Sequence, residues 1–249
     1  MIVAGNWKMN LSVNEAIELS NGLLKHNDIF FEEKIIIFPS FLIIPDICKL
    51  YKNSKISIGA QDCSIYNNGA FTGQVSAEMI KDAGCKYVII GHSERRSLCH
   101  ETSSIVSLKA VKAISAGLKV IICIGENSKD REKGDYLFVL EDQLKQSLSD
   151  ISSDSNLLSH NIIIAYEPVW AIGTGNTASK KDIEEVHKFI KEIINTNYQF
   201  NYDLPILYGG SVNSKNSSEI FKINNVDGVL VGGASLKSDE FLKIINNSM

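Results

Sequence analysis

Proline is scarce in this sequence, and the number and spacing of its cysteines disfavour a fold held together by disulfides. Only four prolines occur in 249 residues, and no stretch rich in Ser, Pro or Gly interrupts the chain. The five cysteines are odd in number and contain no Cys-x-x-Cys pair, which favours a reducing compartment over a disulfide framework. Without a linker, we expect residues 1–249 to form a single domain.

Long apolar runs and an excess of one charge are missing as well. No run approaches the roughly 18 apolar residues of a membrane helix, and the N-terminus lacks the pattern of a secretory signal. The formal net charge of −4 offers no general attraction for nucleic acid or an anionic membrane. We therefore expect a cytoplasmic protein without nucleic-acid or membrane partners, in which a local site holds any anionic ligand.

The chain does contain 44% hydrophobic residues, enough for a sizeable core, in a repeated pattern. Short β-branched runs, apolar on both faces as in a covered parallel sheet, alternate with stretches of helical period. The predicted strands are Ile2–Met9, Lys34–Pro39, Ile56–Gln61, Tyr87–His92, Lys119–Gly125, Asn161–Glu167, Leu204–Gly209 and Asp227–Gly232.

Helix boundary signals support the stretches between these strands. Ser12 with Glu15 is a candidate capping box, and Gly84 and Gly117 stand where a helix commonly ends. The predicted helices are Val13–Lys25, Ile43–Lys52, Ala77–Ala83, Ser104–Ala116, Tyr136–Ser149, Lys180–Asn195, Ser217–Ile223 and Asp239–Asn246.

Eight strand-then-helix units favour an α/β fold closed into a (β/α)8 barrel over an open doubly wound sheet. An open dinucleotide-binding sheet would carry G-x-G-x-x-G after its first strand, where this chain reads Gly5-Asn6-Trp7-Lys8. A Walker motif is also absent from the sequence. Because barrels place their chemistry at the carboxyl ends of the strands, those positions hold the candidate residues.

The sixth predicted strand ends on an acid. Its apolar run leads into Glu167, and Pro168 ends the strand because it has no N–H and restricts its neighbour. The following loop carries the apolar residues Trp170 and Ile172 and two glycines. A lone carboxylate under such a loop suggests a general base beneath a lid, and a solvated acid at a strand end is the alternative.

Two basic side chains end other strands. Lys8 suits a Schiff-base nucleophile or a fixed positive charge for an anionic substrate, and a lysine reaching to solvent is the alternative. His92 stands beside a predicted helix start, whose N–H groups would lower the pKa of the imidazole and keep it neutral. A metal site of His92, Cys99 and His100 is disfavoured, because adjacent Cys and His on a helical segment point apart.

Paired glycines come after the last two predicted strands, at Gly209-Gly210 and Gly232-Gly233. Such pairs let the backbone approach a ligand closely, and a helix start beyond each would add a positive dipole end. Two such turns on adjacent strands suit a phosphate dianion, and tight turns that merely need small residues are the alternative.

Two further segments carry weaker signals. We interpret Cys123, at the end of the fifth strand, as a core residue and Glu126 as a hydrogen-bond partner of Trp170. The segment Gln61–Ser76 is long for a connection in a barrel and exposes Phe71, which suggests insertion into a partner.

Five motifs occur together in the order Asn6-Trp7-Lys8, GHSERR at 91–96, AYEPVWAIGTG at 165–175, YGGSV at 208–212 and GVLVGGASL at 228–236. With them the chain closely resembles the triosephosphate isomerase family from its first strand to its last helix. The resemblance implies a TIM barrel that interconverts dihydroxyacetone phosphate and D-glyceraldehyde 3-phosphate through an enediolate, with no cofactor and no metal.

The resemblance also implies catalytic roles for the polar residues at the strand ends. Glu167 would remove a proton beside the substrate carbonyl and return it to the neighbouring carbon. His92 would polarise the carbonyl and shuttle protons between the enediolate oxygens. Lys8 would neutralise charge on those oxygens, Asn6 would donate a further hydrogen bond, and Glu94 belongs to the motif with a less settled role.

Phosphate binding and lid support are implied in the same way. Backbone N–H groups of Gly173, Ser211, Gly232 and Gly233 would bind the phosphate together with Lys8. The binding energy of the phosphate can drive closure of the lid, and the closed lid prevents the enediolate from expelling phosphate.

Three residues resemble supports of the lid and of the glutamate beneath it. Ser93 would hold the glutamate while the lid is open, and Trp170 and Tyr208 would support the lid. The distal hinge usually reads Lys-Thr-Ala but begins with Asn176 here, so the kinetics of the lid could differ.

The family is usually a homodimer in which the long third loop enters the neighbouring subunit. Phe71 and Thr72 match the tip of that loop, and we expect a homodimer here. The loop usually reads GAFTGE, whereas this chain has Gln74. A familiar pairing of that acid with the arginine matching Arg95 would weaken to a neutral hydrogen bond.

Two other hypotheses remain open at this stage. A Schiff-base aldolase would use Lys8 and would leave a covalent adduct after borohydride treatment with a keto-phosphate. A non-catalytic barrel would serve as a binding protein and would show no turnover in a coupled assay.

Overall fold

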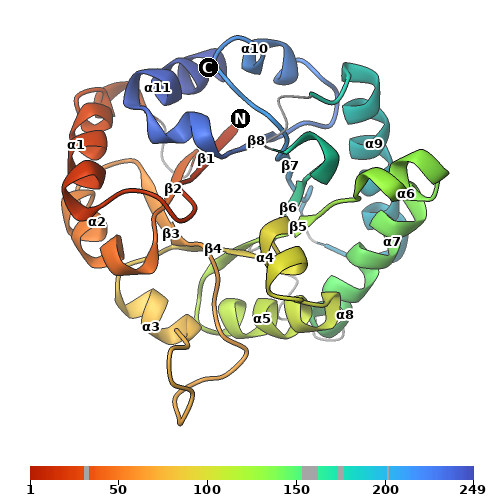
Figure 1. Ribbon diagram of the computed structural model, residues 1–249, viewed down its shortest axis with the longest axis horizontal. Helices are drawn as coiled ribbons and strands as arrows, with labels where there is room; N and C mark the ends of the chain where they lie inside the picture. The colour runs from red at the N-terminus through yellow and green to blue at the C-terminus, as the bar shows by residue number, and fades with distance from the viewer. Residues whose placement is uncertain (31–33, 153–161, 173–176, 201) are drawn as a thin grey trace.

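The computed structural model describes residues 1–30, 34–152, 162–172, 177–200 and 202–249. Parallel strands close into a barrel in which β1 pairs with both β2 and β8 (Figure 1), which confirms the predicted (β/α)8 fold. The strands are β1 (Ile2–Asn6), β2 (Ile35–Phe38), β3 (Ser57–Ala60), β4 (Tyr87–Ile90), β5 (Lys119–Ile124), β6 (Ile162–Tyr166), β7 (Ile206–Tyr208) and β8 (Gly228–Val231).

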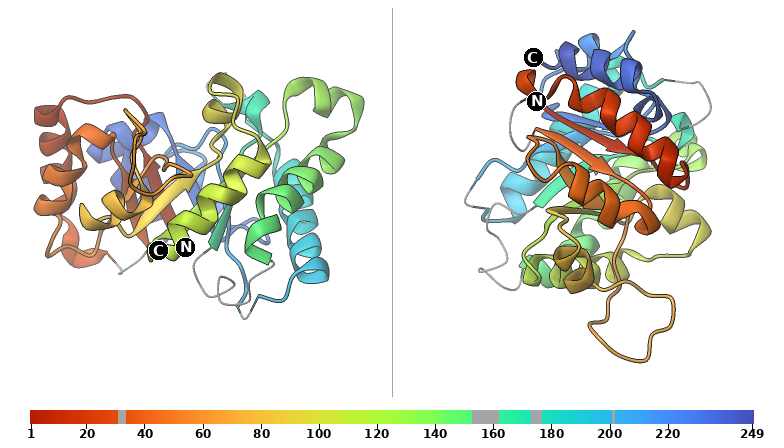
Figure 2. Two further views of the ribbon diagram at one scale, coloured as in Figure 1. Left: turned by 90° about the horizontal axis from the view of Figure 1, so that it is seen from below. Right: turned by 90° about the vertical axis from the view of Figure 1, so that its left-hand side faces the viewer.

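Helices surround the barrel, and the two termini lie close together (Figure 2). The α-helices are α1 (Val13–Leu24), α2 (Ile44–Leu50), α3 (Ala77–Asp82), α4 (Ser93–Leu98), α5 (Ser103–Ser115), α6 (Ser128–Lys133), α7 (Tyr136–Ser147), α8 (Ser149–Ser152), α9 (Lys180–Asn197), α10 (Ser217–Ile220) and α11 (Ser238–Asn247). Short 3-10 helices are η1 (Asn27–Ile29), η2 (Phe41–Ile43), η3 (Val169–Ala171) and η4 (Gly233–Leu236).

Each predicted helix is present, with small shifts at its ends, whereas α6 and α8 were not predicted. The capping box of α1 is confirmed, because Ser12 accepts from the backbone of Glu15 and the Glu15 side chain accepts from Ser12. Gly84 and Gly117 come directly after the C-caps of α3 and α5 with φ of +99° and +77°, the left-handed conformation that favours glycine.

Alternate residues of each strand face two different cores. In β5, Ile121 and Cys123 pack inside the barrel, which confirms Cys123 as a core residue, whereas Val120, Ile122 and Ile124 pack against the surrounding helices. Both faces of the sheet are therefore buried. This explains why the strands read as nearly continuous apolar runs.

The predicted strands extend too far at their carboxyl ends. Lys8, His92 and Glu167 lie beyond the ends of β1, β4 and β6, so their placement inside strands was wrong. Apolar patterning does not show where a chain leaves the ladder. Here Lys8 has φ of +53° and Gly91 has φ of +66°, values incompatible with an extended strand.

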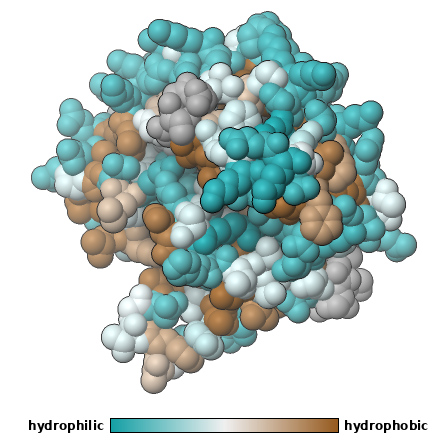
Figure 3. Space-filling model, turned by 45° about the vertical axis from the view of Figure 1, so that its right-hand side comes forward, coloured by the Kyte–Doolittle hydropathy of each residue, from teal (hydrophilic) through white to brown (hydrophobic). Residues whose placement is uncertain are grey.

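The segment between β3 and α3 projects from the barrel at the bottom of Figure 1 and stands out from the surface in Figure 3. Residues 61–76 contain no helix or strand. The rings of Tyr66 and Phe71 stack with centroids 3.9 Å apart, and Phe71 is 38% exposed. The predicted long loop with an exposed aromatic is confirmed. Across the described ranges, no helix is long and apolar enough to cross a membrane.

Candidate active site

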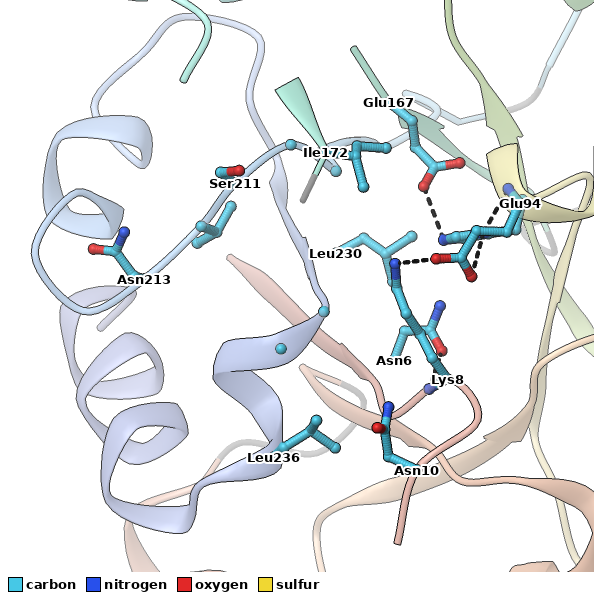
Figure 4. A pocket seen from close by; sticks show the side chains of 16 residues that line it. Asn6, Lys8, Asn10, Glu94, Glu167, Ile172, Ser211, Asn213, Leu230 and Leu236 are labelled. Carbon is cyan, nitrogen blue, oxygen red and sulfur yellow. Dashed lines mark hydrogen bonds and ion pairs between the residues drawn. The ribbon is translucent and has the colours of Figure 1, made fainter. Parts of the chain in front are cut away.

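A cavity of about 370 Å³ opens at the carboxyl ends of the barrel strands (Figure 4). Its walls come from the residues at and beyond the ends of β1, β4, β6, β7 and β8, as the barrel fold predicts. The cavity brings together most of the predicted site residues, namely Asn6, Lys8, His92, Glu94, Glu167, Ser211, Gly232 and Gly233.

Glu167 is held at the wall of this cavity by two donors. Its carboxylate lies 3.0 Å from His92 Nε2 and accepts a hydrogen bond of 2.9 Å from the backbone N–H of Ser93. Burial alone would raise the pKa of this carboxyl, since Glu167 is only 2% exposed. The contacts with His92 and Ser93, with a contribution from Lys8, outweigh burial and lower the pKa. Glu167 is therefore a carboxylate that is buried and restrained.

His92 is the N-cap of α4 and occupies a cradle formed by that helix. The backbone N–H of Glu94 donates to His92 Nδ1 at 3.2 Å, so Nδ1 is an acceptor and Nε2 carries the proton that faces Glu167. The predicted N–H group aimed at the ring is confirmed.

The predicted lowering of the His92 pKa is wrong for this arrangement. Burial lowers the pKa, but the negative charge and hydrogen bond of Glu167 outweigh burial and raise it. The prediction considered the helix N–H groups and omitted a carboxylate that arrives from β6. A buried imidazole responds to the nearest full charge more strongly than to one peptide dipole.

Lys8 reaches into the cavity from an unusual backbone conformation. Its N–H donates to Asn6 Oδ1 at 2.9 Å, and its Nζ lies 2.5 Å from Glu94 Oε1 (Figure 4). Gln61 Nε2 donates both to Lys8 O at 2.8 Å and to Phe38 O at 2.9 Å. Gln61 thus fixes the turn that carries Lys8. The sequence interpretation missed this role because Gln61 had been assigned only as the end of the third strand and the start of the long loop.

The double glycine after β7 is required by close contacts. A Cβ at Gly209 would lie 2.9 Å from Glu167 Cγ, and a Cβ at Gly210 would lie 2.1 Å from Tyr208 Oη. Glycine therefore leaves room for the Glu167 side chain and for the ring of Tyr208. Ser211 donates its hydroxyl to Ala171 O at 2.7 Å, which ties this turn to the loop after Glu167.

The two glycine turns lead into different structures. After β8, η4 begins at Gly233, directly beside the cavity. After β7, α10 begins at Ser217, as predicted, several residues beyond the glycine turn, so the N-terminus of this helix does not adjoin the turn. Its backbone is instead stabilised by Asn216 Nδ2, which donates to Ser211 O at 2.9 Å. Gly173, the remaining predicted phosphate ligand, lies outside the described residues.

A buried carboxylate anchors the start of the loop that comes after Glu167. Glu126 Oε1 accepts from Trp170 Nε1 at 2.8 Å and from Tyr166 Oη at 3.0 Å, which confirms the predicted pairing of Glu126 with Trp170. Burial raises the pKa of Glu126, although these two donors and the charge of Arg131 oppose the shift. The indole of Trp170 is therefore held by Glu126, which does not line the cavity.

Further apolar and amide side chains complete the cavity. Leu230 forms its floor as an inward-facing residue of β8, and Ile172 lies beside Glu167 (Figure 4). Leu230 was detectable as the inward residue nearest the carboxyl end of its strand. No sequence signal marks Asn10, Asn213 or Leu236, which reach the cavity from loops and η4.

The remaining predicted residues lie elsewhere. Phe71, Thr72 and Gln74 are exposed on the projecting loop and do not line the cavity. Asn176 lies outside the described residues. Cys99 and His100 come after the end of α4 instead of lying on a helix, which corrects that part of the prediction. In the part of the chain that the structure describes, no three His, Cys, Asp or Glu side chains form a group that could hold a metal ion.

Comparison with known proteins decides the family. The model of a family described as "Triosephosphate isomerase" matches residues 1–248. The chain belongs to the triosephosphate isomerase family. It is 46% identical to a triosephosphate isomerase of Lawsonia intracellularis, an alignment that covers 99% of this chain and 97% of the relative. It is 43% identical to one of Flavobacterium psychrophilum, with 98% of each chain covered.

A solved structure supports the same assignment. The crystal structure of triosephosphate isomerase from Bartonella henselae matches with a TM-score of 0.86 and 37% identity, over 99% of this chain and 98% of that one. Membership in the triosephosphate isomerase family therefore rests on the whole chain, barrel and loops together.

Proposed function

We propose that this chain interconverts dihydroxyacetone phosphate and D-glyceraldehyde 3-phosphate by proton transfer through an enediolate, without a cofactor. The observation that carries this proposal is the convergence of Glu167, His92 and Lys8 on one cavity from three separate strands. A carboxylate base, an N–H donor and a fixed cation are the groups that proton abstraction beside a carbonyl requires.

Glu167 is the proposed base. In the structure its carboxylate bonds His92 and Ser93, so it must turn from this resting position toward the substrate carbon. The missing Cβ of Gly209, next to Glu167 Cγ, leaves space for that movement. The turned carboxylate removes the proton beside the carbonyl and returns it to the neighbouring carbon.

His92 and Lys8 are the proposed stabilisers of the enediolate. When Glu167 turns away, the Nε2–H of His92 becomes available to the substrate oxygens. Lys8 supplies the positive charge, and Asn6 and Glu94 hold it in place. Each preorganised donor contributes roughly 3–4 kcal/mol if it acts like an oxyanion-hole donor.

The phosphate is proposed to lie between the two glycine turns. Gly232, Gly233 and Ser211 all line the cavity. The backbone N–H of Gly173 is the proposed further donor. Backbone N–H groups suit a dianion that must be bound without reacting. Trp170 and Tyr208 are the proposed supports of the lid: Trp170 is held by Glu126, and the ring of Tyr208 packs against Gly210.

A cytoplasmic homodimer is the proposed state of the protein. The stacked Tyr66 and Phe71 on the projecting loop present an exposed aromatic surface, which suits insertion into a second copy together with Thr72 and Gln74. The odd number of cysteines supports a reducing compartment.

The substitution Glu167→Asp tests the proposed base. Shortening the side chain by one methylene withdraws the carboxylate from the substrate carbon, so we expect kcat to fall by roughly 100- to 1,000-fold with KM nearly unchanged. The measurement is turnover of D-glyceraldehyde 3-phosphate by purified, metal-free protein. Glu132→Asp, an exposed acid on α6, is the matched control and should keep its activity. Near-normal turnover by Glu167→Asp would remove Glu167 from the role of base.

A further inference from the structure

A pair of cysteines lies at the end of the barrel opposite the cavity. Cys48 belongs to α2, and Cys85 comes after the glycine that ends α3, two residues before β4 begins. The side chain of Cys48 packs against the turn that carries Cys85, and a hydrogen bond between the two thiols shifts the pKa of each. Because Cys85 precedes β4, the pair lies at the amino-terminal ends of the strands, and catalysis does not use it.

The backbone around the pair is close and well fixed. A Cβ at Gly84 would lie 3.3 Å from Cys48 Cβ and 3.4 Å from Cys48 Sγ, so the turn that ends α3 packs directly against Cys48. Cys85 N–H donates to Ile80 O at 3.2 Å, and the next residue donates to Ile58 O at 2.8 Å. Helix α2 thus places Cys48 beside the turn that carries Cys85, and that turn is joined to the barrel.

One thiol of the pair is accessible and the other is not. Cys48 is half-buried and lines a cavity of about 500 Å³, together with Lys49, Lys52 and Lys86. Cys85 is 1% exposed. Positive charge near a thiol favours the thiolate, which is the reactive form.

The hydrogen bond assigns different roles to the two thiols. Donation from Cys85 lowers the pKa of the Cys48 thiol, against the effect of its partial burial. The same bond, together with burial, raises the pKa of Cys85. Cys63 and Cys123 are buried, and burial raises the pKa of Cys63 to about 12 and that of Cys123 well above the usual value. Cys48 is therefore better prepared to react than either of these.

We propose that Cys48 and Cys85 form a redox-active dithiol that a peroxide oxidises to a disulfide. The Cys48 thiolate attacks one peroxide oxygen, which gives a sulfenic acid on Cys48 and, after protonation of the leaving hydroxide, one water. The Cys85 thiol then attacks the Cys48 sulfur, the S–S bond forms, and a second water leaves. Two thiols and one peroxide give one disulfide and two waters. A small dithiol reverses the step by exchange.

The disulfide would close the segment from residue 48 to residue 85. That segment contains β3 and the projecting loop with Phe71, so the oxidation state of the pair constrains the region proposed for contact with a second copy. The catalytic cavity lies outside this segment, apart from the contacts that Gln61 makes with β1 and β2.

Peptide mapping after mild oxidation tests the proposal. Reduced, folded protein is exposed to dilute hydrogen peroxide, its free thiols are blocked, and the chain is digested and analysed by mass spectrometry. We expect the intact chain to lose two hydrogen atoms and the peptides with Cys48 and Cys85 to become linked. Dithiothreitol should restore both thiols. Cys48 remaining a free thiol while Cys99 is oxidised would overturn the proposal.

Three variants separate the roles of the thiols. Cys48→Ser should form no link, and Cys85→Ser should stop at a Cys48 sulfenic acid that dimedone traps. Cys99→Ser removes an exposed thiol elsewhere and should form the link as the parent does. Retained turnover shows that each variant is folded. A Cys85→Ser protein without trapped sulfenic acid, or a link that joins other cysteines, would refute the assignment.

Discussion

Two groups of charged side chains include neighbouring residues of α4 and differ in charge balance and in access to solvent. Glu94 contributes to the catalytic group with Lys8, His92 and Glu167, which lines a cavity. Arg95 contributes to a second group with Asp62, Glu101 and Lys109. There Lys109 Nζ lies 2.7 Å from Asp62 and 2.5 Å from Glu101, and Arg95 lies 3.0 Å and 2.5 Å from the same carboxylates.

The difference lies in charge balance and in access. The second group has two acids and two bases that neutralise each other, and it lines none of the cavities described above. The catalytic group has two acids, one ammonium and a histidine that can be neutral, so it carries spare charge beside open space. Burial of ionised side chains alone therefore does not identify an active site. A group of ionised side chains whose charges are not balanced, next to a cavity, is the better indicator.

The largest expected effect is that of Lys8→Met on catalysis. The variant keeps the length of the side chain and removes the charge that faces the substrate, so we expect kcat/KM to fall by at least about 1,000-fold, or about 4 kcal/mol. Its partner Glu94 is half-exposed, so stability should change by less than about 1 kcal/mol. Steady-state kinetics measures kcat/KM, and urea unfolding measures the stability. A loss of activity that merely parallels a loss of folded protein would show that Lys8 stabilises the fold and is not needed for the reaction.

Lys109→Met should have the opposite profile. Its removal leaves the carboxylates of Asp62 and Glu101 buried with Arg95 alone, so we expect a loss of about 3–5 kcal/mol in the free energy of unfolding. The kcat of the folded fraction should stay within about fivefold of the parent.

A surface ion pair provides the matched control for Lys109. Lys145 lies 2.6 Å from Glu141 on the exposed face of α7, and Lys145→Met should change stability by less than about 1 kcal/mol. Urea unfolding of both variants makes the measurement. If Lys109→Met were as stable as Lys145→Met but inactive, the second group would have to be reassigned to catalysis.

A buried histidine outside both groups predicts acid sensitivity. Burial lowers the pKa of His187 to about 4 from the ordinary 6.5, although Nδ1 faces Asn225 O at 2.9 Å. Below pH 6.5 the unfolded chain binds a proton that the folded chain does not. Stability should therefore fall as the pH drops from 6.5 to 4, by up to about 3 kcal/mol from this group.

His187→Gln measures that contribution, because glutamine does not titrate. Urea midpoints between pH 4.5 and 7.5 should depend less on pH in the variant than in the parent. Equal slopes for His187→Gln and the parent would show that other groups cause the acid sensitivity.

The smallest expected effect concerns the anchor below the lid. Glu126→Gln retains an acceptor for Trp170 and Tyr166 but removes the charge 3.6 Å from Arg131. We expect kcat to change by about fivefold or less, near 1 kcal/mol, with the largest change at high solvent viscosity if lid motion limits turnover. A loss comparable with that of Lys8→Met would place Glu126 in the catalytic group.

Much of the architecture could be predicted, because the spacing of apolar residues along a strand or helix is a property of the local sequence. The eight strands, their helices and the long loop were identified from patterns that both faces of a buried sheet impose. The ends of the strands were not, since the left-handed turn at Lys8 and the turn at Gly91 depend on contacts with distant segments. Gln61, which fixes the Lys8 turn, carried no recognisable signal for the same reason.

By itself, the amino-acid sequence determined the order of strands and helices, the apolar character of both sheet faces and the motifs that the family shares. Tertiary structure alone decided that the carboxylate of Glu167 meets the imidazole of His92, and that this contact raises the histidine pKa where the local helix would lower it. It also decided that Cys48 meets Cys85. The spacing of apolar residues along the chain is a local property, so it can be read from the sequence. The pKa of a charged group or a thiol depends instead on the groups that the closed barrel places beside it, and these come from distant parts of the chain.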